Sequence, residues 1–261
     1  MTLTAAHAPP DGPLSPEQVA RFHRDGFLVV PRLFGAAAVR DIGAWTAEVQ
    51  AWPETAGRHM MYFETSSAGE RILNRMENVL PYHDGFRALA NGPELRGASG
   101  QLLGEAAVLF KDKINFKLPG GGGFEAHQDV QAGWSRYADL HLTALVAVDR
   151  ATIANGCLEI ATDFRGSHQL IGAEWEPLTE AQLGDLHWAY IEAEPGDVVY
   201  FDSFVPHRSA PNQTREHRRV LYYTYNRASA GDRLAQYYAD KRASYPPDIE
   251  RVAGREYRYR V

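Results

Sequence analysis

Short runs of aromatic and β-branched residues fill the chain from Met60 onward, and they limit its possible folds more than any other feature. The eight runs are HMMYFET, RILNRMENV, AVLFKDKINFKL, LHLTALVAV, CLEIAT, WAYIEA, DVVYFD and RVLYYTYN. Turn-forming residues separate them, at Gly120 to Gly123, at Asn155-Gly156 and at Pro195-Gly196. Strands of this number and spacing predict a mainly β fold, a β-sandwich or jelly roll with helices packed outside.

Helices are expected before these strands and once among them. In LSPEQVARFHRDGF, Ser15 is suited to cap a helix, Gln18 to complete a capping box, and Gly26 to end the helix. FLVVP then predicts a strand. A second helix is predicted over Ala36 to Trp52, and GFRALANGPELRGASGQLLG predicts a helix between strands. The inward-facing residues of the second helix are expected to be Val39, Ile42 and Val49.

The length of 261 residues suits one large domain, and neither a repeat nor a break in composition marks a second one. We therefore expect a disordered lead-in over residues 1–14 and a single domain over residues 15–261. The C-terminal stretch DKRASYPPDIERVAGREYRYRV is expected to pack over the opening of the site. Removal of the residues after Tyr245 would then weaken substrate binding more than it affects folding.

The composition narrows the compartment and the partners. The net charge of -6 argues against a nucleic-acid-binding surface. Cys157 is the only cysteine, which excludes an internal disulfide and a cysteine zinc cluster and fits a reducing cytoplasm. No apolar run approaches the roughly 18 residues of a membrane span, and the N-terminus lacks a signal-peptide pattern. We expect a cytoplasmic protein that acts on a small molecule, without nucleic acid or membrane. Its oligomeric state stays open.

His127 and Asp129 stand two residues apart in FEAHQDVQAGW, directly after four glycines. In a strand, residues i and i+2 point to the same face, so an imidazole and a carboxylate would lie side by side. The pair could hold a metal, or be two ordinary polar residues on a wet strand. His207 follows another predicted strand, and two histidines with one carboxylate form the iron(II) site of non-haem oxygenases. The weaker histidine candidates are His141, His168, His187 and His217.

Arg218 and Arg219 stand side by side in HRRVLYYTYN. Strand alternation sends one of them inward and the other outward. A guanidinium inside a β fold needs an anion, because an unpaired buried charge is costly, and a carboxylate is its natural bidentate partner. A register slip of one residue would exchange the two arginines, so alternation alone leaves both open.

Together, H-x-D at 127 to 129, His207 and an arginine eleven residues later resemble the phytanoyl-CoA dioxygenase family. These are Fe(II)- and 2-oxoglutarate-dependent oxygenases. DGFLVVP, NGCLEI, RGSH and PGDVVYFD match family elements in the same order, so the likeness covers nearly the whole chain. It implies a double-stranded β-helix (jelly roll, cupin-like) with flanking N-terminal helices.

The resemblance also implies iron(II), 2-oxoglutarate and O₂ as cofactors. The metal ligands that it implies are His127, Asp129 and His207. The 2-oxoglutarate-binding residues that it implies are Arg218, Ser209, Asn115 and Phe124. The carboxylate of Asp129 points to hydroxylation, since related iron halogenases carry a small residue at this position.

Lys111, Lys113, Asn115 and Lys117 would share one face of the strand KDKINFKLPG. The substrate-pocket residues that the resemblance implies are Lys111, Lys113, Trp134 and Arg75. For Lys117 a solvated position is favoured, and for Trp134 packing at the rim is an equal alternative. KDKINFKLPGG followed by HQDVQAGW most resembles the family branch that hydroxylates small organophosphonates, such as 2-aminoethylphosphonate.

Three functions follow as expectations. The first is hydroxylation of an unactivated C–H bond in a small anionic or zwitterionic substrate, similar to 2-aminoethylphosphonate. The second is hydroxylation of an amino-acid-derived or natural-product intermediate, and the least favoured is a non-catalytic metal- or ligand-binding jelly roll. A zinc hydrolase is disfavoured, because no general-base carboxylate is paired with a histidine motif. The glycine run is expected to be a flexible segment at the mouth of the site.

Overall fold

Each of the eight predicted runs contains a β-strand in the computed structural model, which describes residues 12–164, 168–184 and 186–257. The prediction of a mainly β fold is confirmed, and the strand pairs in the described residues are antiparallel. None of the described helices is long and apolar enough to cross a membrane.

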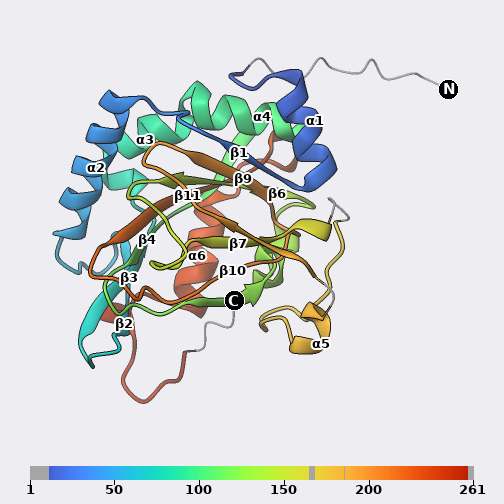
Figure 1. Cartoon of the computed structure of the whole chain (residues 1–261). Coiled ribbons are helices and arrows are strands. Elements are labelled where there is room, and N and C mark those ends of the chain that lie inside the picture. The colour runs from blue at the N-terminus through green and yellow to red at the C-terminus, as the bar shows by residue number, and fades with distance from the viewer. Residues whose placement is uncertain (1–11, 165–167, 185, 258–261) are drawn as a thin grey trace.

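The strands form two sheets (Figure 1). The larger sheet contains, in spatial order, β1 (Phe27–Val30), β9 (Val198–Asp202), β6 (His141–Ala147), β11 (Arg218–Arg227), β4 (Ala107–Lys117), β3 (Arg71–Glu77) and β2 (Met60–Thr65). The smaller sheet contains β5 (Phe124–His127), β10 (His207–Ser209), β7 (Leu158–Ala161) and β8 (Trp188–Ile191). Side chains of both sheets, among them Leu158, Val199 and Tyr222, form one buried cluster between them.

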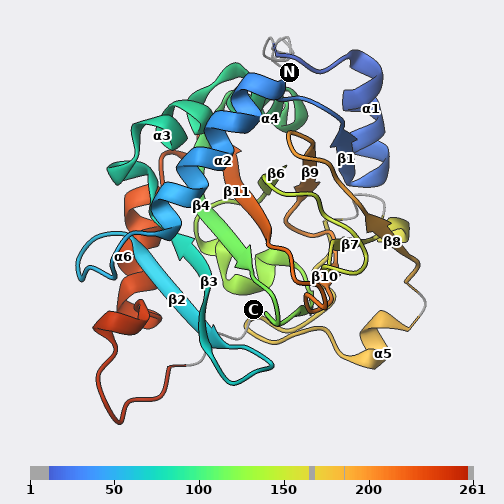
Figure 2. The same cartoon turned by 60° about the vertical axis from the view of Figure 1, so that its left-hand side comes forward.

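The helices are α1 (Pro16–Asp25), α2 (Ala36–Gln50), α3 (Asp84–Asn91), α4 (Ala98–Leu103), α5 (Glu180–Leu183) and α6 (Leu234–Ser244). Figures 1 and 2 show α1 to α4 gathered on one side of the molecule, over the larger sheet. The capping box of Ser15 and Gln18 forms as predicted, and Gly26 ends α1 with a left-handed backbone (φ 79°). The helix predicted between the strands is α3 and α4, joined by one π-helical turn, Pro93–Gly97.

Strand alternation gives the larger sheet two different faces. The outer-face residues Ile114 and Phe116 of β4 and Tyr223 of β11 belong to a core that also contains helix residues, Ile42 and Val49 among them. Val39 is only partly buried against this core. The inner face of β4 carries Lys111, Lys113, Asn115 and Lys117, opposite Thr224, Tyr222, Val220 and Arg218 of β11. The apolar face therefore fixes the register, and the register directs a row of polar side chains toward the smaller sheet.

The two ends of the chain bear on two predictions, the lead-in over residues 1–14 and the packing of the C-terminal segment. Of the predicted lead-in, residues 1–11 lie outside the described residues. Leu14, however, is buried and exchanges two backbone hydrogen bonds with the Gln101 side chain, so order begins before Ser15. At the other end, Asp248 and Glu250 bond the backbone N–H groups of Phe63 and Gly57. This segment packs beside β2.

The hydroxyl of Tyr238 attaches α6 to the larger sheet. Beside it, β4 no longer pairs with β3, since that ladder ends at Lys113. The hydroxyl accepts hydrogen bonds from the N–H groups of Asn78 (3.1 Å) and Asp112 (2.9 Å), and Asp112 Oδ1 lies 2.8 Å away as its acceptor. Backbone groups that would otherwise be buried without partners are thus satisfied by a helix side chain.

Replacing Tyr238 with Phe should therefore lower the free energy of unfolding by about 2 kcal/mol, since two N–H groups and a carboxylate lose a buried partner. Urea denaturation would measure the change. Tyr190→Phe, at a tyrosine that is 54% exposed, is the matched control and should stay within about 0.5 kcal/mol of the wild type. Equal stability of the two variants would contradict this role of the hydroxyl.

Candidate active site

The three side chains predicted as metal ligands converge between the two sheets. His127 ends β5, His207 begins β10, and the two residues pair directly across the smaller sheet. Their Nε2 atoms lie 4.0 and 3.9 Å from Asp129 Oδ1. Among the residues that the structure describes, this is the one group of three histidine, cysteine or acidic side chains placed to hold a metal ion.

Backbone carbonyls orient both imidazoles. Nδ1 of His127 lies 2.7 Å from Glu125 O, and Nδ1 of His207 lies 2.9 Å from Val205 O. Because a carbonyl can only accept, each Nδ1 carries the proton and each Nε2 keeps its lone pair for a metal. Burial, together with the neighbouring His207, lowers the pKa of His127 to about 3, and burial also lowers the pKa of His207. Both rings are neutral at pH 7, the form that binds metals.

Asp129 lies just beyond β5, and not within a strand. It begins a short 3₁₀ helix, Asp129–Ala132. Gln128 keeps an extended backbone (φ -107°, ψ 131°), so the side chains on either side of it still point the same way. The Thr143 hydroxyl donates to Asp129 Oδ2 (3.3 Å), which leaves Oδ1 facing the two imidazoles. The donor set of two neutral imidazoles and one carboxylate fits a facial iron(II) site.

A pocket surrounds this group and collects most of the predicted site residues. We call His127, Asp129 and His207 the metal group. The pocket is lined by these three residues and by Arg75, Lys111, Lys113, Asn115, Phe124, Leu158, Arg208, Ser209 and Tyr222. Of the predicted site residues, Arg218 and Trp134 are not among them. Trp134 is 3% exposed and packs against Phe110 and His141, with Lys111 Nζ 5.0 Å from its ring centroid. The structure thus places Trp134 behind Lys111, outside the pocket wall.

The two neighbouring arginines have opposite environments. Arg219 forms a two-point ion pair with Asp149 (2.8 and 2.9 Å) at the partly exposed outer face. Arg218 is 1% exposed and forms no ion pair with a described carboxylate, and its Nε has no hydrogen-bond partner among the described residues. The Tyr222 hydroxyl interacts with both Arg218 and Asn115. Arg218 is therefore the inward arginine.

The favoured solvated position of Lys117 is wrong. Lys117 is 2% exposed, directly opposite Arg218. Its Nζ donates to Ser209 Oγ at 2.7 Å and to the carbonyls of Gly156 and Ala210. Burial, followed by the nearby Arg218, lowers the pKa of Lys117 to about 6. The alternation argument placed this lysine on the inner face, and the turn at Gly156 and the end of β10 supply the acceptors that make its burial possible.

The other inner-face cations lie toward the opposite end of β4. Burial and the neighbouring Lys111 lower the pKa of Lys113 to about 7. Lys111 is 3% exposed and has aromatic faces around its ammonium, those of Trp134 and Tyr237 at 5.0 and 5.3 Å. No hydrogen bond or ion pair of this ammonium with a described side chain is present. Excess positive charge is therefore concentrated beside the metal group.

The glycine run before β5 is held by hydrogen bonds and close packing, in contrast to the expected flexible segment. Gly122 N donates to Glu64 Oε2 (3.0 Å), and Gly120 N to Asn212 O (3.3 Å). A Cβ on Gly123 would lie 2.5 Å from Ser209 O. Glycine is required here because β5 passes so close to β10 that no side chain fits between them.

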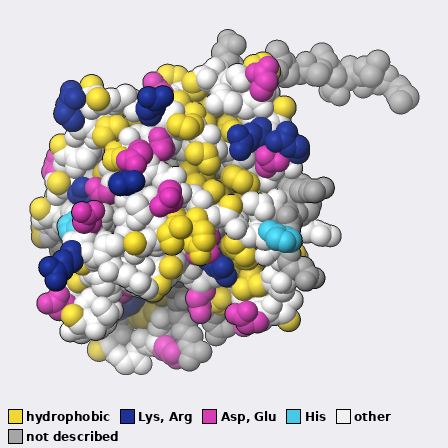
Figure 3. All heavy atoms as spheres, viewed as in Figure 1, with side chains coloured by type: hydrophobic (Ala, Val, Ile, Leu, Met, Phe, Trp, Pro, Cys, Tyr) yellow, Lys and Arg dark blue, Asp and Glu magenta, His cyan; other side chains and the backbone are white. Residues whose placement is uncertain are grey.

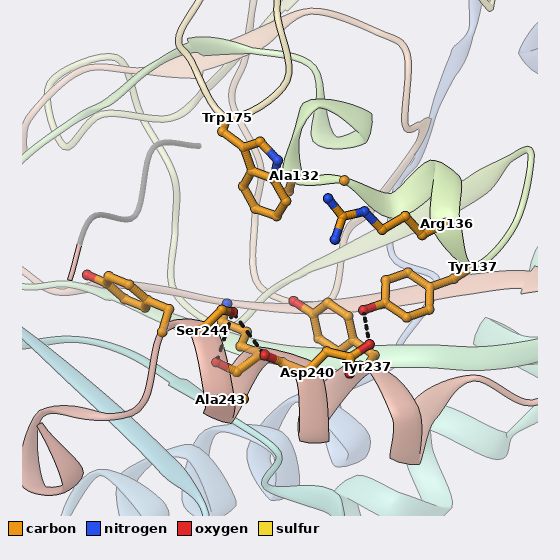
Figure 4. A pocket seen from close by; sticks show the side chains of 11 residues that line it. Ala132, Arg136, Tyr137, Trp175, Tyr237, Asp240, Ala243 and Ser244 are labelled. Carbon is orange, nitrogen blue, oxygen red and sulfur yellow. Dashed lines mark hydrogen bonds between the residues drawn. The ribbon is translucent and has the colours of Figure 1, made fainter.

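A second cleft, of about 750 Å³, lies between α6 and the segment 132–137, and none of the metal ligands lines it. Figure 4 shows Trp175 and Arg136 on one side of it and Asp240 and Ser244 of α6 on the other. The Tyr137 hydroxyl donates to Asp240 Oδ2 across the cleft (2.8 Å). Lys241 of α6 also lines it. No described residue after Tyr245 lines either this cleft or the pocket around the metal group.

Sequence reasoning missed Tyr222, Lys241 and Glu77. Tyr222 could have been found, because it lies four residues after Arg218 and so on the same strand face. Glu77 could have been found in the same way, because it lies two residues after Arg75 in β3. Lys241 gave no such pattern, because it meets Glu77 only through the packing of α6 on the sheet.

Comparisons with known proteins agree with this geometry. The family model described as phytanoyl-CoA dioxygenase (PhyH) matches residues 22–220. A protein named 2-aminoethylphosphonate dioxygenase, from the uncultured bacterium HF130_AEPn_1, is 42% identical over 245 residues, covering 92% of this chain and 92% of its own length. A methylphosphonate hydroxylase from Gimesia maris is 37% identical and covers 89% of this chain and 88% of its own.

A solved structure supports the fold. The crystal structure of EctD from S. alaskensis with 2-oxoglutarate and 5-hydroxyectoine matches with a TM-score of 0.71 and 23% identity. The match covers 86% of this chain and 81% of that one. At this level of identity the likeness concerns the arrangement of sheets and helices.

Metal binding by the three-residue group can be tested by thermal unfolding. Mn(II) or Fe(II) under argon should raise the midpoint of the wild type by about 5 °C at a hundredfold excess over Kd. His127→Ala should lose this rise because one ligand is missing, whereas His217→Ala, at an exposed histidine, should keep it. The same rise in both variants would rule out His127 as a ligand.

Proposed function

Because the chain belongs to the phytanoyl-CoA dioxygenase family, we propose that it hydroxylates a C–H bond of a small organophosphonate similar to 2-aminoethylphosphonate. It is an Fe(II)- and 2-oxoglutarate-dependent dioxygenase, and the two sheets would be the double-stranded β-helix of such enzymes. The observation that carries the substrate class is the group of cations beside the metal group, the buried Arg75 and Lys111 and the partly buried Lys113.

His127, Asp129 and His207 would hold the iron. Iron held there would supply the activation of O₂, so that one oxygen atom would enter the C–H bond and the other would enter succinate as 2-oxoglutarate loses CO₂. The protein's part is to keep both imidazoles neutral and oriented and to hold the reacting molecules in place. Thr143 fixes the carboxylate of Asp129 for this purpose.

The 2-oxoglutarate end of the pocket would lie at Arg218. A buried guanidinium without a protein carboxylate is suited to bind the distal carboxylate of the cosubstrate at two points. Ser209 and Lys117 lie at the same end of β4, joined by a 2.7 Å hydrogen bond. Asn115 and Phe124 would line the passage from Arg218 to the metal group.

The substrate end would lie at Lys111, Lys113 and Arg75. A carboxylate carries one negative charge, whereas a phosphonate can carry two and offers three oxygens to surrounding donors. Of the described cations that line the pocket, Arg208 is paired with Glu159, whereas Arg75, Lys111 and Lys113 all interact with the single carboxylate of Glu77. A dianion would balance this charge, and it would hold Lys113 protonated although its pKa is about 7 without one.

Removal of the inward arginine gives a test of the cosubstrate assignment. Arg218→Met should weaken 2-oxoglutarate binding at least about 30-fold, because truncating one partner of a buried charge pair costs 2 kcal/mol or more. Arg219→Met is the matched control. It should leave the affinity within about threefold and lower stability by about 1 kcal/mol, since its partner Asp149 is partly exposed. Calorimetric titration of metal-loaded protein would decide, and the reverse order would exchange the two arginines.

The substrate class can be tested by succinate release. Iron-loaded protein with 2-oxoglutarate and O₂ should release succinate at least about tenfold faster with 2-aminoethylphosphonate or methylphosphonate than without substrate. 3-Aminopropanoate, which carries a carboxylate in place of the phosphonate, should give little stimulation. Stimulation by amino acids alone would instead favour an amino-acid-derived substrate, and no succinate under any condition would favour a non-catalytic binder.

A further inference from the structure

The chain contains only four lysines, at positions 111, 113, 117 and 241. Three of them are buried and Lys113 is partly buried, so the basic side chains spread over the face in Figure 3 are chiefly arginines. Three of these lysines lie on the inner face of β4. The fourth, Lys241, comes from α6 and lies outside the residues that the family model matches. The contacts of Lys241 indicate why a buried lysine on α6 lies beside those of β4.

Lys241 reaches a carboxylate that is fully buried. Its Nζ lies 2.9 and 2.8 Å from the two oxygens of Glu77, which is 0% exposed. Glu77 Oε1 also lies 3.1 Å from Nε of Arg75. Burial opposes the ionisation of Glu77, but Lys241, Lys111 and Arg75 together hold its pKa below the ordinary value. Glu77 is therefore a carboxylate shared by several cations.

This carboxylate connects α6 to the pocket. Arg75 lines the pocket around the metal group, and Glu77 lies directly opposite Lys113 across β3 and β4. Arg75 also stacks on Tyr62, with 4.5 Å between its Cζ and the ring centroid. The arginine is thus held on one side by an aromatic face and on the other by Glu77, whose position depends on Lys241.

We infer that Lys241 and Glu77 form a positioning pair, which holds Arg75 where it recognises the doubly charged head of the substrate. Neither residue lines the pocket around the metal group, so both act through Arg75. The second cation is needed because Glu77 alone would neutralise Arg75. Burial lowers the pKa of Lys241, and its contact with Glu77 opposes that shift. With Lys241 protonated, the group of Arg75, Glu77 and Lys241 would keep a net positive charge toward the pocket. The inference rests on the proposed phosphonate substrate and adds the element that selects a dianion over a monoanion.

The position of Lys241 in α6 allows the ion pair to be removed by substitution without detaching the helix. Tyr238, one turn earlier in α6, is fixed to Asp112, so the helix is held independently of the ion pair. Lys241 borders the 750 Å³ cleft. Arg136, a cation that forms no described contact with Glu77, lines the same cleft (Figure 4). Arg136→Met is therefore a control that removes the same charge from the same cleft.

The test compares Lys241→Met, Glu77→Gln, the double variant and Arg136→Met, all loaded with Mn(II) and 2-oxoglutarate. Calorimetry gives Kd for 2-aminoethylphosphonate and for 3-aminopropanoate. Each single variant should weaken phosphonate binding at least tenfold, keep 2-oxoglutarate binding within threefold, and reduce the preference for phosphonate over carboxylate. The double variant, which removes both charges of the Lys241–Glu77 ion pair, should fold and lose no more than the single variants. Arg136→Met should stay within threefold of the wild type.

Lysine resonances give a second readout. With ¹³C-labelled lysine only four ε-carbon signals arise, and phosphonate should shift those of Lys111 and Lys113 in the wild type and much less in Glu77→Gln. Wild-type protein that binds no phosphonate would overturn the proposed function and this inference together. Phosphonate binding that is equally tight in the wild type, both single variants and the double variant would overturn the inference alone.

Discussion

Positive charge buried without enough negative charge is the constraint on which the site depends. An isolated cation inside a protein is costly, and a fold keeps one only where partners or a ligand compensate for it. Here Arg218 at one end of the inner face and Lys111 at the other have no ion pair with a described carboxylate. The two ends are separated along β4 by six residues, or about 20 Å. Two separate anions, one at each end of the metal group, would satisfy this arrangement.

The rest of the fold makes that arrangement possible. Helices α2 to α4 cover the outer face of the larger sheet, where Tyr225 and Tyr200 also bond helix carbonyls. This apolar face carries the packing energy, so the inner face can carry polar residues. The close approach at Gly123 then brings β5 beside β10, and with it His127 beside His207. The two imidazoles of the metal group therefore meet because β5 pairs with β10, and this pairing requires a glycine at position 123.

Much of this could be predicted from the sequence because it depends on local periodicity. Alternation placed Lys111, Lys113, Asn115 and Arg218 on one face, and the capping box of Ser15 and Gln18 was visible in the letters. The solvated position assigned to Lys117 failed because its acceptors, the carbonyls of Gly156 and Ala210, come from segments 39 and 93 residues away. For Trp134 a pocket wall and packing at the rim were equal alternatives, and a 3₁₀ turn directs it behind Lys111. Local pattern gives the face of a strand, but not what packs against it.

Lys241 shows where such reasoning ends and what replaces it. Its helix has an almost even mixture of polar and apolar residues, and no spacing relates it to Glu77, which lies 164 residues earlier. One compositional fact was nevertheless available, since the chain uses arginine 23 times and lysine four times. Lysine is a compact charge on a flexible stem, and its pKa shifts readily when it is buried, which suits it to roles inside a site. In a chain whose surface cations are arginines, each lysine is therefore a candidate for an interior role, and all four lie on the same side of the larger sheet or at its edge.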